Sequence, residues 1–267
     1  MLLAIDIGNT NVVIGVYDGS RLVTHVRVAT DRQRTEDEYG LLLRQLLSER
    51  GIDLGRIDAA VLASVVPPLT EVWRRAVRDR FAVAPLVIGP GVRTGMPVLY
   101  ENPREVGADR VVNGVAGYER FRAAPGGPHG VIIVDFGTAT TFDVVSPKGE
   151  YLGGAIAPGV HISTDALFMR ASKLPRVDLE VPKSVVGRTT VTSMQAGILF
   201  GYVGLVDGLI GRMRRELDFA PKVIATGGLA PLIAAHTQGI EEVDEFLTLT
   251  GLLLIHGRNE REGSDVA

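Results

Sequence analysis

Asp6 is the one polar side chain in an apolar run that covers residues 1–7. The run predicts a buried strand that carries a carboxylate near its carboxyl end. Gly8 then permits a tight turn, and residues 9–11 (Asn-Thr-Asn) add short polar side chains. Backbone amides and hydroxyls in such a turn can line a phosphate, and the carboxylate can hold Mg²⁺ directly or through water. The stretch is therefore a candidate phosphate site.

The same pattern recurs in the second half of the chain. Residues 131–136 form another apolar run in which Asp135 precedes Gly137 by two positions, and residues 138–141 are small or carry hydroxyls. A single Asp-x-Gly turn often only ends a strand. Two copies with matching flanking strands, however, predict two phosphate-binding hairpins that face one cleft. Asp135 would then be able to hold a second cation. The glycine pair at residues 227–228 would let an adenine or ribose lie against the backbone.

Residues 107–110 (Gly-Ala-Asp-Arg) place an acid beside a base, flanked by small residues. Taken alone, the segment fits a solvated ion pair. The alternative is a carboxylate base next to a guanidinium that binds a substrate carboxylate. Phosphoryl transfer to a hydroxyl depends mainly on positioning and charge stabilisation, and it needs a proton acceptor only late in a loose transition state. The residue types alone do not decide between the solvated ion pair and the carboxylate base.

The elements that would position these groups occur twice in the same order. In each copy an apolar strand, a polar turn, a second strand, a hairpin turn and a third strand follow one another. Two copies at matching positions predict a duplicated α/β fold with halves at residues 1–125 and 126–267, divided in the Pro- and Gly-rich stretch 121–130. We expect each half to be a mixed sheet that opens with three antiparallel strands, with helices around it and a nucleotide cleft between the halves. The expected strands are residues 1–7, 12–17 and 21–28, and then 131–136, 142–145 and 150–156.

Helices are predicted between these strands. Thr35 and Glu38 form a capping box ahead of a helix to residue 50, and Pro103 suits a first helical turn. A long helix over residues 190–217 carries glycines at three- and four-residue steps, which favour close packing in the core or across a subunit boundary. Its apolar part contains Asp207 and falls short of a membrane span. A helix over residues 246–258 closes the second half.

Composition excludes several classes of protein. The 267 residues, 46% of them hydrophobic, suit one large domain or two small ones with a substantial core. The net charge of −3 gives no electrostatic footprint for nucleic acid or an anionic membrane, so we expect neither as a partner. The absence of Cys excludes thiol chemistry and a disulfide scaffold. No basic segment precedes the first apolar run, so we expect no signal peptide and a cytoplasmic location.

Other catalytic motifs are missing from the sequence. There is no Gly-x-x-x-x-Gly-Lys-Ser/Thr loop, no His-Arg-Asp loop and no Gly-x-Ser-x-Gly elbow. The glycine-rich stretch 89–95 lacks the spacing of a dinucleotide fingerprint. The five histidines show no metal-binding spacing, and His161, beside a glycine turn, is interpreted as structural.

The duplicated hairpins resemble the superfamily of acetate kinases, sugar kinases, heat-shock chaperones and actin. More narrowly, the whole chain resembles type III pantothenate kinase. The segments on which this resemblance rests follow the family's order over nearly the full length of the chain. Their combination is specific to the family, although each segment alone is not. They are residues 6–11, 100–103, 107–110, 135–141, 187–190 with 193–195, and 226–228.

This resemblance implies a homodimeric enzyme that uses ATP with Mg²⁺ to phosphorylate pantothenate at its primary hydroxyl, the first step of coenzyme A synthesis. It implies that Asp109 accepts the hydroxyl proton and that Asp135 holds a monovalent cation, K⁺ or NH₄⁺. The residues it implies for ATP are Asp6, Ile7, Gly8, Asn9, Thr10, Asn11, Val12, Val13 and Thr138. Those it implies for pantothenate are Tyr100, Gly107, Ala108, Asp109, Arg110 and Thr190.

The chain departs from the family at Thr189, where Asn is more usual, so a local hydrogen bond can differ there. Two other functions remain open. One is a different small-molecule kinase of the same superfamily, which residues 107–110 and the short chain argue against. The other is an ATP-binding regulator without turnover, because an intact set of motifs does not establish catalysis.

Overall fold

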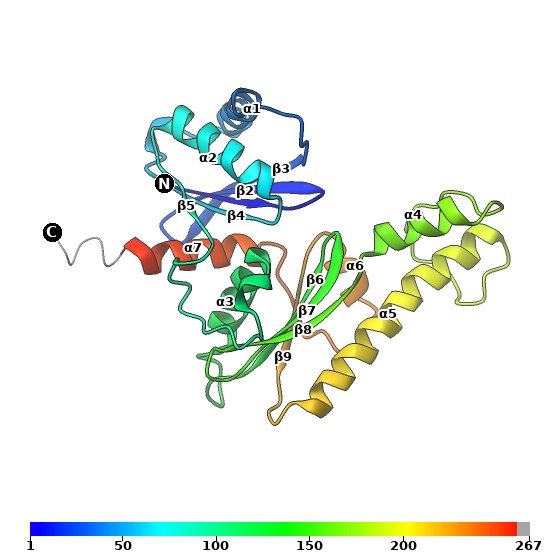
Figure 1. Ribbon diagram of the computed structural model, residues 1–267. Helices are drawn as coiled ribbons and strands as arrows, with labels where there is room; N and C mark the ends of the chain where they lie inside the picture. Colours follow the sequence, from blue (N-terminus) through cyan, green and yellow to red (C-terminus); the bar gives the residue numbers. More distant parts are fainter. Residues whose placement is uncertain (261–267) are drawn as a thin grey trace. The chain divides into compact units, whose positions relative to one another are not determined.

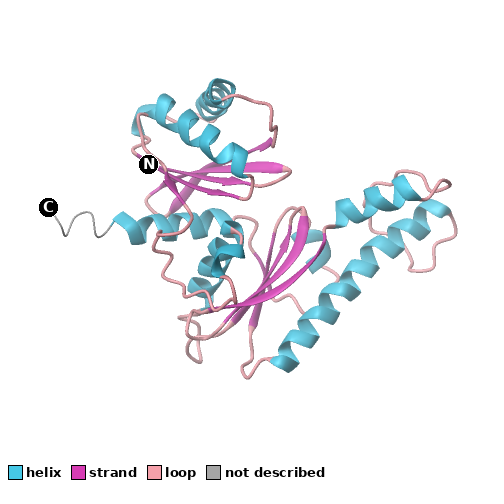
Figure 2. Ribbon diagram, in the orientation of Figure 1, coloured by secondary structure: helices cyan, strands magenta, loops and turns pink. Residues whose placement is uncertain are grey.

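Residues 1–260 are described by a computed structural model, and they form two units. The first unit consists of residues 1–116 together with the C-terminal helix from Leu247, and the second of residues 117–246. Each unit holds one five-stranded mixed sheet with helices around it (Figures 1 and 2). The predicted mixed α/β fold, with two sheets that each open on three antiparallel strands, is confirmed.

The first sheet has the strand order β3-β2-β1-β4-β5. Its first three strands are antiparallel, and β4 and β5 run parallel to β1. Ile7 at the end of β1 pairs with Ser64 at the end of β4, so two carboxyl ends lie side by side at one edge of the sheet. The strands are β1 (Leu2–Ile7), β2 (Asn11–Asp18), β3 (Arg21–Ala29), β4 (Ala59–Ser64) and β5 (Leu86–Val87).

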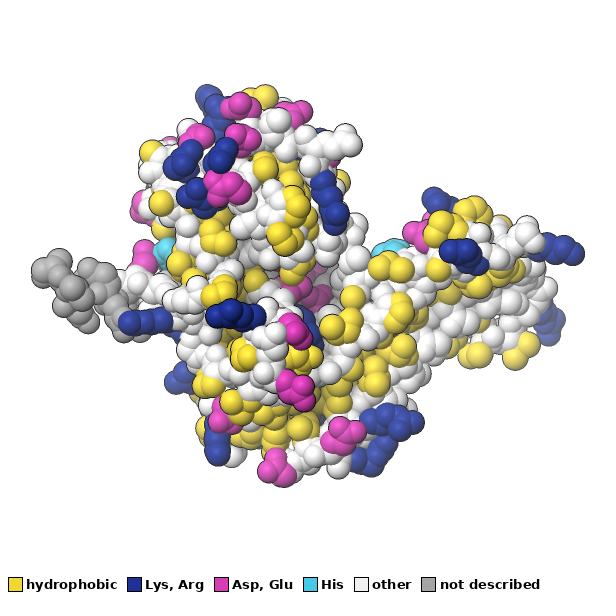
Figure 3. Space-filling view, viewed as in Figure 1, with side chains coloured by type: hydrophobic (Ala, Val, Ile, Leu, Met, Phe, Trp, Pro, Cys, Tyr) yellow, Lys and Arg dark blue, Asp and Glu magenta, His cyan; other side chains and the backbone are white. Residues whose placement is uncertain are grey.

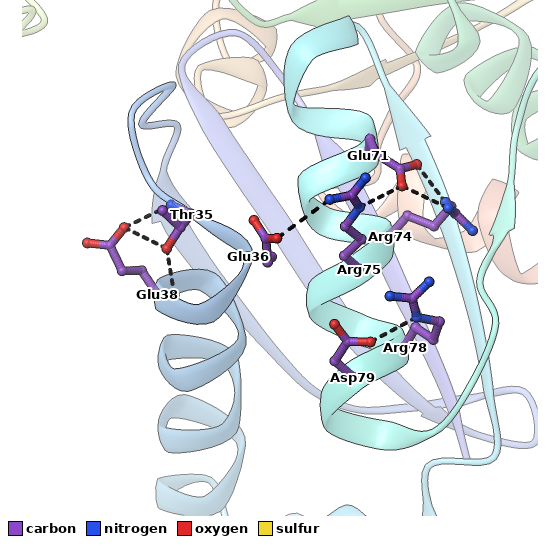
Figure 4. Close-up of polar contacts among 8 residues, drawn as sticks. All are labelled: Thr35, Glu36, Glu38, Glu71, Arg74, Arg75, Arg78 and Asp79. Atoms are coloured by element: carbon purple, nitrogen blue, oxygen red, sulfur yellow. Dashed lines mark hydrogen bonds and ion pairs between the residues drawn. The ribbon is translucent and has the colours of Figure 1, made fainter.

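Helices α1 (Glu36–Glu49) and α2 (Pro67–Phe81) pack together over one face of this sheet. The rings of Tyr39 and Trp73 lie 4.4 Å apart, centroid to centroid, in the core between the helices and the strands. The predicted capping box is confirmed, because the Thr35 hydroxyl accepts from the Glu38 amide and the Glu38 carboxylate accepts from the Thr35 amide (Figure 4).

The outer surface of α2 carries ion pairs a turn apart. Arg74 and Arg75 both donate to Glu71, at 2.7 and 2.9 Å (Figure 4). These hydrogen bonds lower the pKa of Glu71 to about 2. The three side chains are exposed, so water and salt screen the pairs, and they contribute to solubility more than to stability.

Helix α7 (Leu247–Glu260) belongs to the first unit and packs against β1, β4 and β2. The two units differ from the predicted halves in two ways. The prediction assigned this helix to the second half, whereas it belongs to the first unit. The prediction also put the boundary after residue 125, whereas the boundary lies within α3 (Ala108–Phe121). The physical reason is burial. Leu249 reaches into the space above Gly15 in β2, and Leu252 and Ile255 are fully buried. A sequence pattern shows that a helix is apolar, but it does not show which sheet covers it.

The second sheet has the order β10-β9-β6-β7-β8, with β6, β7 and β8 antiparallel and β9 and β10 parallel to β6. The arrangement repeats that of the first sheet, as the duplicated sequence pattern predicts. The strands are β6 (Val131–Phe136), β7 (Ala139–Val145), β8 (Tyr151–Pro158), β9 (Lys222–Thr226) and β10 (Glu242–Val243).

Helices α4 (Val160–Arg170), α5 (Thr190–Glu216) and α6 (Ala230–Ala234) complete the second unit. One side of α5 packs on the sheet core through Leu199, Val206 and Ile210. The prediction that this helix falls short of a membrane span was wrong by length and composition, since it has 27 residues and an 18-residue window of it reaches a mean hydropathy of 1.4. A core helix of a soluble protein meets the same criterion, and 44% of the apolar window is buried.

Candidate active site

The turn after β1 is tight and held in place by the end of β3. The Gly8 amide donates to the Asn11 carbonyl at 3.0 Å, and a Cβ at Gly8 would lie 2.9 Å from that oxygen. The hydroxyl of Thr30 donates to the Gly8 carbonyl at 2.7 Å, and the amide of Thr30 donates to the Thr10 carbonyl at 2.9 Å. Asn9 and Thr10 are exposed at the tip. The turn therefore presents polar groups from a fixed backbone, as a phosphate site requires.

The predicted ATP segment divides into exposed and buried positions. Asp6 and Asn11 are half-buried at the sheet edge, whereas Ile7 and Val12 are fully buried in the core. Ile7 and Val12 can therefore offer a ligand only their backbone atoms. Val13 pairs with Asp6 across the hairpin, so it lies directly beside the carboxylate.

The second turn, after β6, is one residue shorter than the first. The Gly137 amide donates to the Ala139 carbonyl at 3.1 Å, and Gly137 and Thr138 are exposed. Gly159 lies against this turn so closely that a Cβ there would be 2.1 Å from the Thr138 carbonyl oxygen. Sequence reasoning missed Gly159, because no local pattern shows that the end of β8 returns to the turn.

Asp135 lies in a cradle of backbone at the end of β6. A Cβ at Gly227, which has φ +91°, would be 2.7 Å from the Asp135 carboxylate and 2.6 Å from the Phe136 carbonyl oxygen. The Asp135 carboxylate and the Phe136 carbonyl are both oxygen donors, the type that hard cations prefer. Among residues 1–260 no group of three or more His, Cys, Asp or Glu gathers to form a metal centre.

The acid–base segment forms the start of α3. The Gly107 carbonyl accepts from the amides of Arg110 and Val111, at 3.1 and 3.3 Å, so the helix begins at Ala108 and Asp109 lies in its first turn. Pro103 lies in a first helical turn as predicted, in a separate short 3₁₀ helix (Pro103–Glu105) that Asn102 caps.

The carboxylate of Asp109 folds back over the start of the helix. Its Oδ1 accepts from the Arg110 amide at 2.8 Å, and a Cβ at Gly107 would come within 2.5 Å of the same oxygen. Burial raises the pKa of Asp109, against the opposing effects of that amide and of the Arg110 charge. The side chain of Arg110 is buried. A fully solvated pair does not describe this segment, because Arg110 is buried and Asp109 is half-buried.

Asp109 and the first phosphate turn belong to one unit. Val65, which follows β4, donates its amide to the Ile7 carbonyl at 3.0 Å, and a Cβ at Gly107 would lie 3.7 Å from a Val65 methyl. The start of α3 therefore lies beside the end of β1, just before the turn. Sequence reasoning missed Val65, whose only signal is its place directly after a buried strand.

Replacing Gly107 by Ala is expected to lower catalysis more than stability. The added methyl would collide with the Asp109 carboxylate, which can rotate away but then loses its position. We expect kcat to fall by about tenfold or more, because small misplacements of reacting groups are costly, with the unfolding temperature nearly unchanged. Gly55→Ala is the matched control, since its Cβ would be 3.4 Å from the Asp53 carboxylate at an exposed site. Equal kcat in Gly107→Ala and wild type would contradict the expectation.

The remaining two predicted pantothenate residues lie in different units. Tyr100 lies in the first unit, in the loop before the 3₁₀ helix, with 37% of its surface exposed. Thr190 lies in the second unit at the first residue of α5, on a groove of about 950 Å³ that Ser163, Arg188 and Tyr202 also line.

The unusual Thr189 is the N-cap of α5, and its hydroxyl accepts from the Thr192 amide. Asn and Thr are both favoured N-cap residues, so Thr at this position preserves the start of the helix.

Comparisons with known proteins place most of the chain in one family. A family model described as type III pantothenate kinase matches residues 2–212. Over 259 residues the chain is 60% identical to type III pantothenate kinases of Myxococcus xanthus and Geobacter sulfurreducens, covering 97% of this chain and 99% of each relative. A solved ROK family glucokinase from Streptomyces griseus has a TM-score of 0.52 at 14% identity, covers 96% of this chain and 98% of its own, and shows the fold alone. The chain belongs to the type III pantothenate kinase family.

Proposed function

We propose that this protein transfers the γ-phosphate of ATP to the primary hydroxyl of pantothenate, forming 4'-phosphopantothenate in the first step of coenzyme A biosynthesis. Family membership over nearly the full chain supports the reaction. One structural observation carries the assignment of the chemistry. A half-buried carboxylate, Asp109, lies at the start of α3 beside the end of the strand that leads into the first phosphate turn.

ATP with Mg²⁺ is proposed to bind at the turn after β1. The exposed Asn9 and Thr10 and the backbone amides of the turn would contact phosphate oxygens, and Asp6 would hold Mg²⁺ directly or through water. Mg²⁺ would supply charge neutralisation on the phosphates. Thr138, exposed on the second turn, is proposed to contribute its hydroxyl to the same nucleotide.

The phosphoryl transfer forms one bond and breaks one. The pantothenate hydroxyl oxygen forms a bond to the γ-phosphorus as the bond to the β–γ bridging oxygen breaks, and ADP leaves with that electron pair. The hydroxyl proton passes to the carboxylate of Asp109. Because burial raises the pKa of Asp109, its ionised carboxylate is a stronger base than an ordinary carboxylate.

Pantothenate is proposed to bind around the start of α3. It would contact Tyr100, the run of residues 107–110 and Thr190. The guanidinium of Arg110, which is buried and follows the base directly, suits the pantothenate carboxylate through paired hydrogen bonds. Asp135 is proposed to hold K⁺ or NH₄⁺, since its cradle offers carboxylate and carbonyl oxygens.

A homodimer in the cytoplasm is the proposed assembly. Large apolar side chains are exposed over α4 and the segment before α5, and hydrophobic side chains gather over α4 and α5 in Figure 3. Cβ atoms at Gly197, Gly201 and Gly204 on α5 would meet open space, so another helix could approach closely there. The exposed apolar residues of this surface include Ile162, Leu167, Met169, Val181, Val185, Val186 and Val191.

A coupled ADP-release assay tests the function. The purified protein is supplied with ATP and Mg²⁺, with or without pantothenate, first in potassium and then in sodium buffer. We expect release that requires pantothenate and is faster in potassium. A sugar and acetate panel separates this activity from that of related kinases. Nucleotide binding without release on any acceptor would instead support the ATP-binding regulator.

A further inference from the structure

Helices α3 and α7 are joined by a hydrogen bond one turn beyond the proposed base. Asn113 follows Asp109 by four residues, so the two side chains lie on the same face of α3. The hydroxyl of Thr248, in the first turn of α7, donates to the Asn113 side-chain oxygen at 2.7 Å. Asn113 is only 1% exposed, so water cannot readily replace this bond.

A close backbone contact lies beside that bond. Gly251 of α7 lies against the Val112 carbonyl of α3, and a Cβ at Gly251 would be 2.2 Å from that oxygen and 2.7 Å from the Val112 side chain. The neighbouring atoms are largely backbone, which cannot move aside as a flexible side chain can. Only glycine therefore permits the two helices to approach this closely.

The other side of α7 rests on the sheet face that carries Asp6. Leu249 packs over Gly15, which pairs with Ala4 of β1. Ala4 and Asp6 are two residues apart on β1, so they lie on the same face of the sheet. Thus α7 contacts both the helix that bears the proposed base and the sheet that leads into the phosphate turn, all within one unit.

We propose that α7 is the positioning element of the active site, with Thr248 and Gly251 setting where the start of α3 lies relative to the strand that carries Asp6. This inference rests on the proposed role of Asp109. Thr248 and Gly251 are positioning residues, because they act through Asn113 and Val112 rather than on substrate. The established sequence motifs of the chain do not include them, and they lie about 140 residues along the chain from Asp109.

Thr248→Val removes the hydroxyl donor and keeps the side-chain shape. We expect kcat to fall by about tenfold, since a small displacement of a catalytic group is enough for such a loss, while the KM for ATP changes less than about twofold. Thr248→Ser restores the hydroxyl and is expected to recover most of kcat. Gly251→Ala is expected to lower kcat further and also the unfolding temperature. Thr250→Val, on the same helix turn, is the matched control and should behave as wild type.

Amide hydrogen exchange gives a readout that does not depend on turnover. In Thr248→Val we expect faster exchange at the first turn of α3, including the amides of Arg110 and Val111, with exchange in β6 and β7 unchanged. Wild-type kcat and wild-type exchange in α3 would overturn the inference, even if the unfolding temperature drops. Wild type and Asp109→Asn are assayed alongside. Turnover retained by Asp109→Asn would reject the proposed base, whereas a normal Thr248→Val in a responsive assay would reject only the role of α7.

Discussion

Asp109→Asn is expected to lower pantothenate-dependent ADP release by at least about a hundredfold, the range typical of a lost general base. Asn has the same shape but cannot take the hydroxyl proton, and its side-chain oxygen can still accept from the Arg110 amide as Asp109 does. Nucleotide affinity is expected to persist, because the phosphate turn lies at the end of β1 and not on α3. Steady-state kinetics and nucleotide titration together check both expectations.

The same variant is expected to be more stable than wild type at neutral pH. The pKa of Asp109 is raised by burial, so the folded state holds its proton to a higher pH than the unfolded chain does. Its contribution to stability is therefore full below the ordinary carboxyl pKa and declines as pH rises through the raised value. Asn removes this decline. Thermal unfolding at pH 4 and pH 8 should show the gain mainly at pH 8.

The pH dependence of activity follows from the same raised pKa of Asp109. Because the base must be ionised, kcat/KM should fall on acidification at a pH above the pKa range of an ordinary carboxyl group. Asp37→Asn is a matched control, since Asp37 also lies in the first turn of a helix but its side chain is 89% exposed. This control should retain wild-type turnover. Wild-type turnover in Asp109→Asn would remove Asp109 from its proposed role.

Asp135→Asn is expected to abolish the dependence on potassium. The neutral amide loses the charge that would hold a monovalent cation against the Phe136 carbonyl and Gly227. We expect turnover to fall by about tenfold or more in potassium, as when one preorganised electrostatic contact is lost, and to become equal in potassium and sodium. Rates measured over a potassium titration check this result.

Asp178→Asn serves as the control for that variant, because Asp178 is exposed in the same unit. It should keep the full potassium response. If wild type is equally active in sodium alone, or if Asp135→Asn still responds to potassium, the cation is not held at Asp135. A loss of the folded state would show first as a lowered unfolding temperature, which separates that outcome from loss of the cation.

Local sequence determined the parts of this fold that depend on near neighbours. The apolar runs that end in Asp6 and Asp135 became the central strands of two similar sheets, because alternation, turn glycines and hairpin signals act over a few residues. The capping box at Thr35 and the start of α5 at Thr190 formed where the residue types predicted them. Duplication was readable because both copies follow the same local rules.

Tertiary structure alone decided where distant segments meet and which groups lose water. The apolar pattern of α7 predicted a helix, but only packing placed it on the first sheet, with Gly251 against Val112. Likewise, residues 107–110 fitted a solvated pair as well as a base, and the structure leaves Asp109 half-buried and Arg110 buried rather than solvated. Desolvation depends on every element that covers a group, so it cannot be read from the residues beside it in the chain.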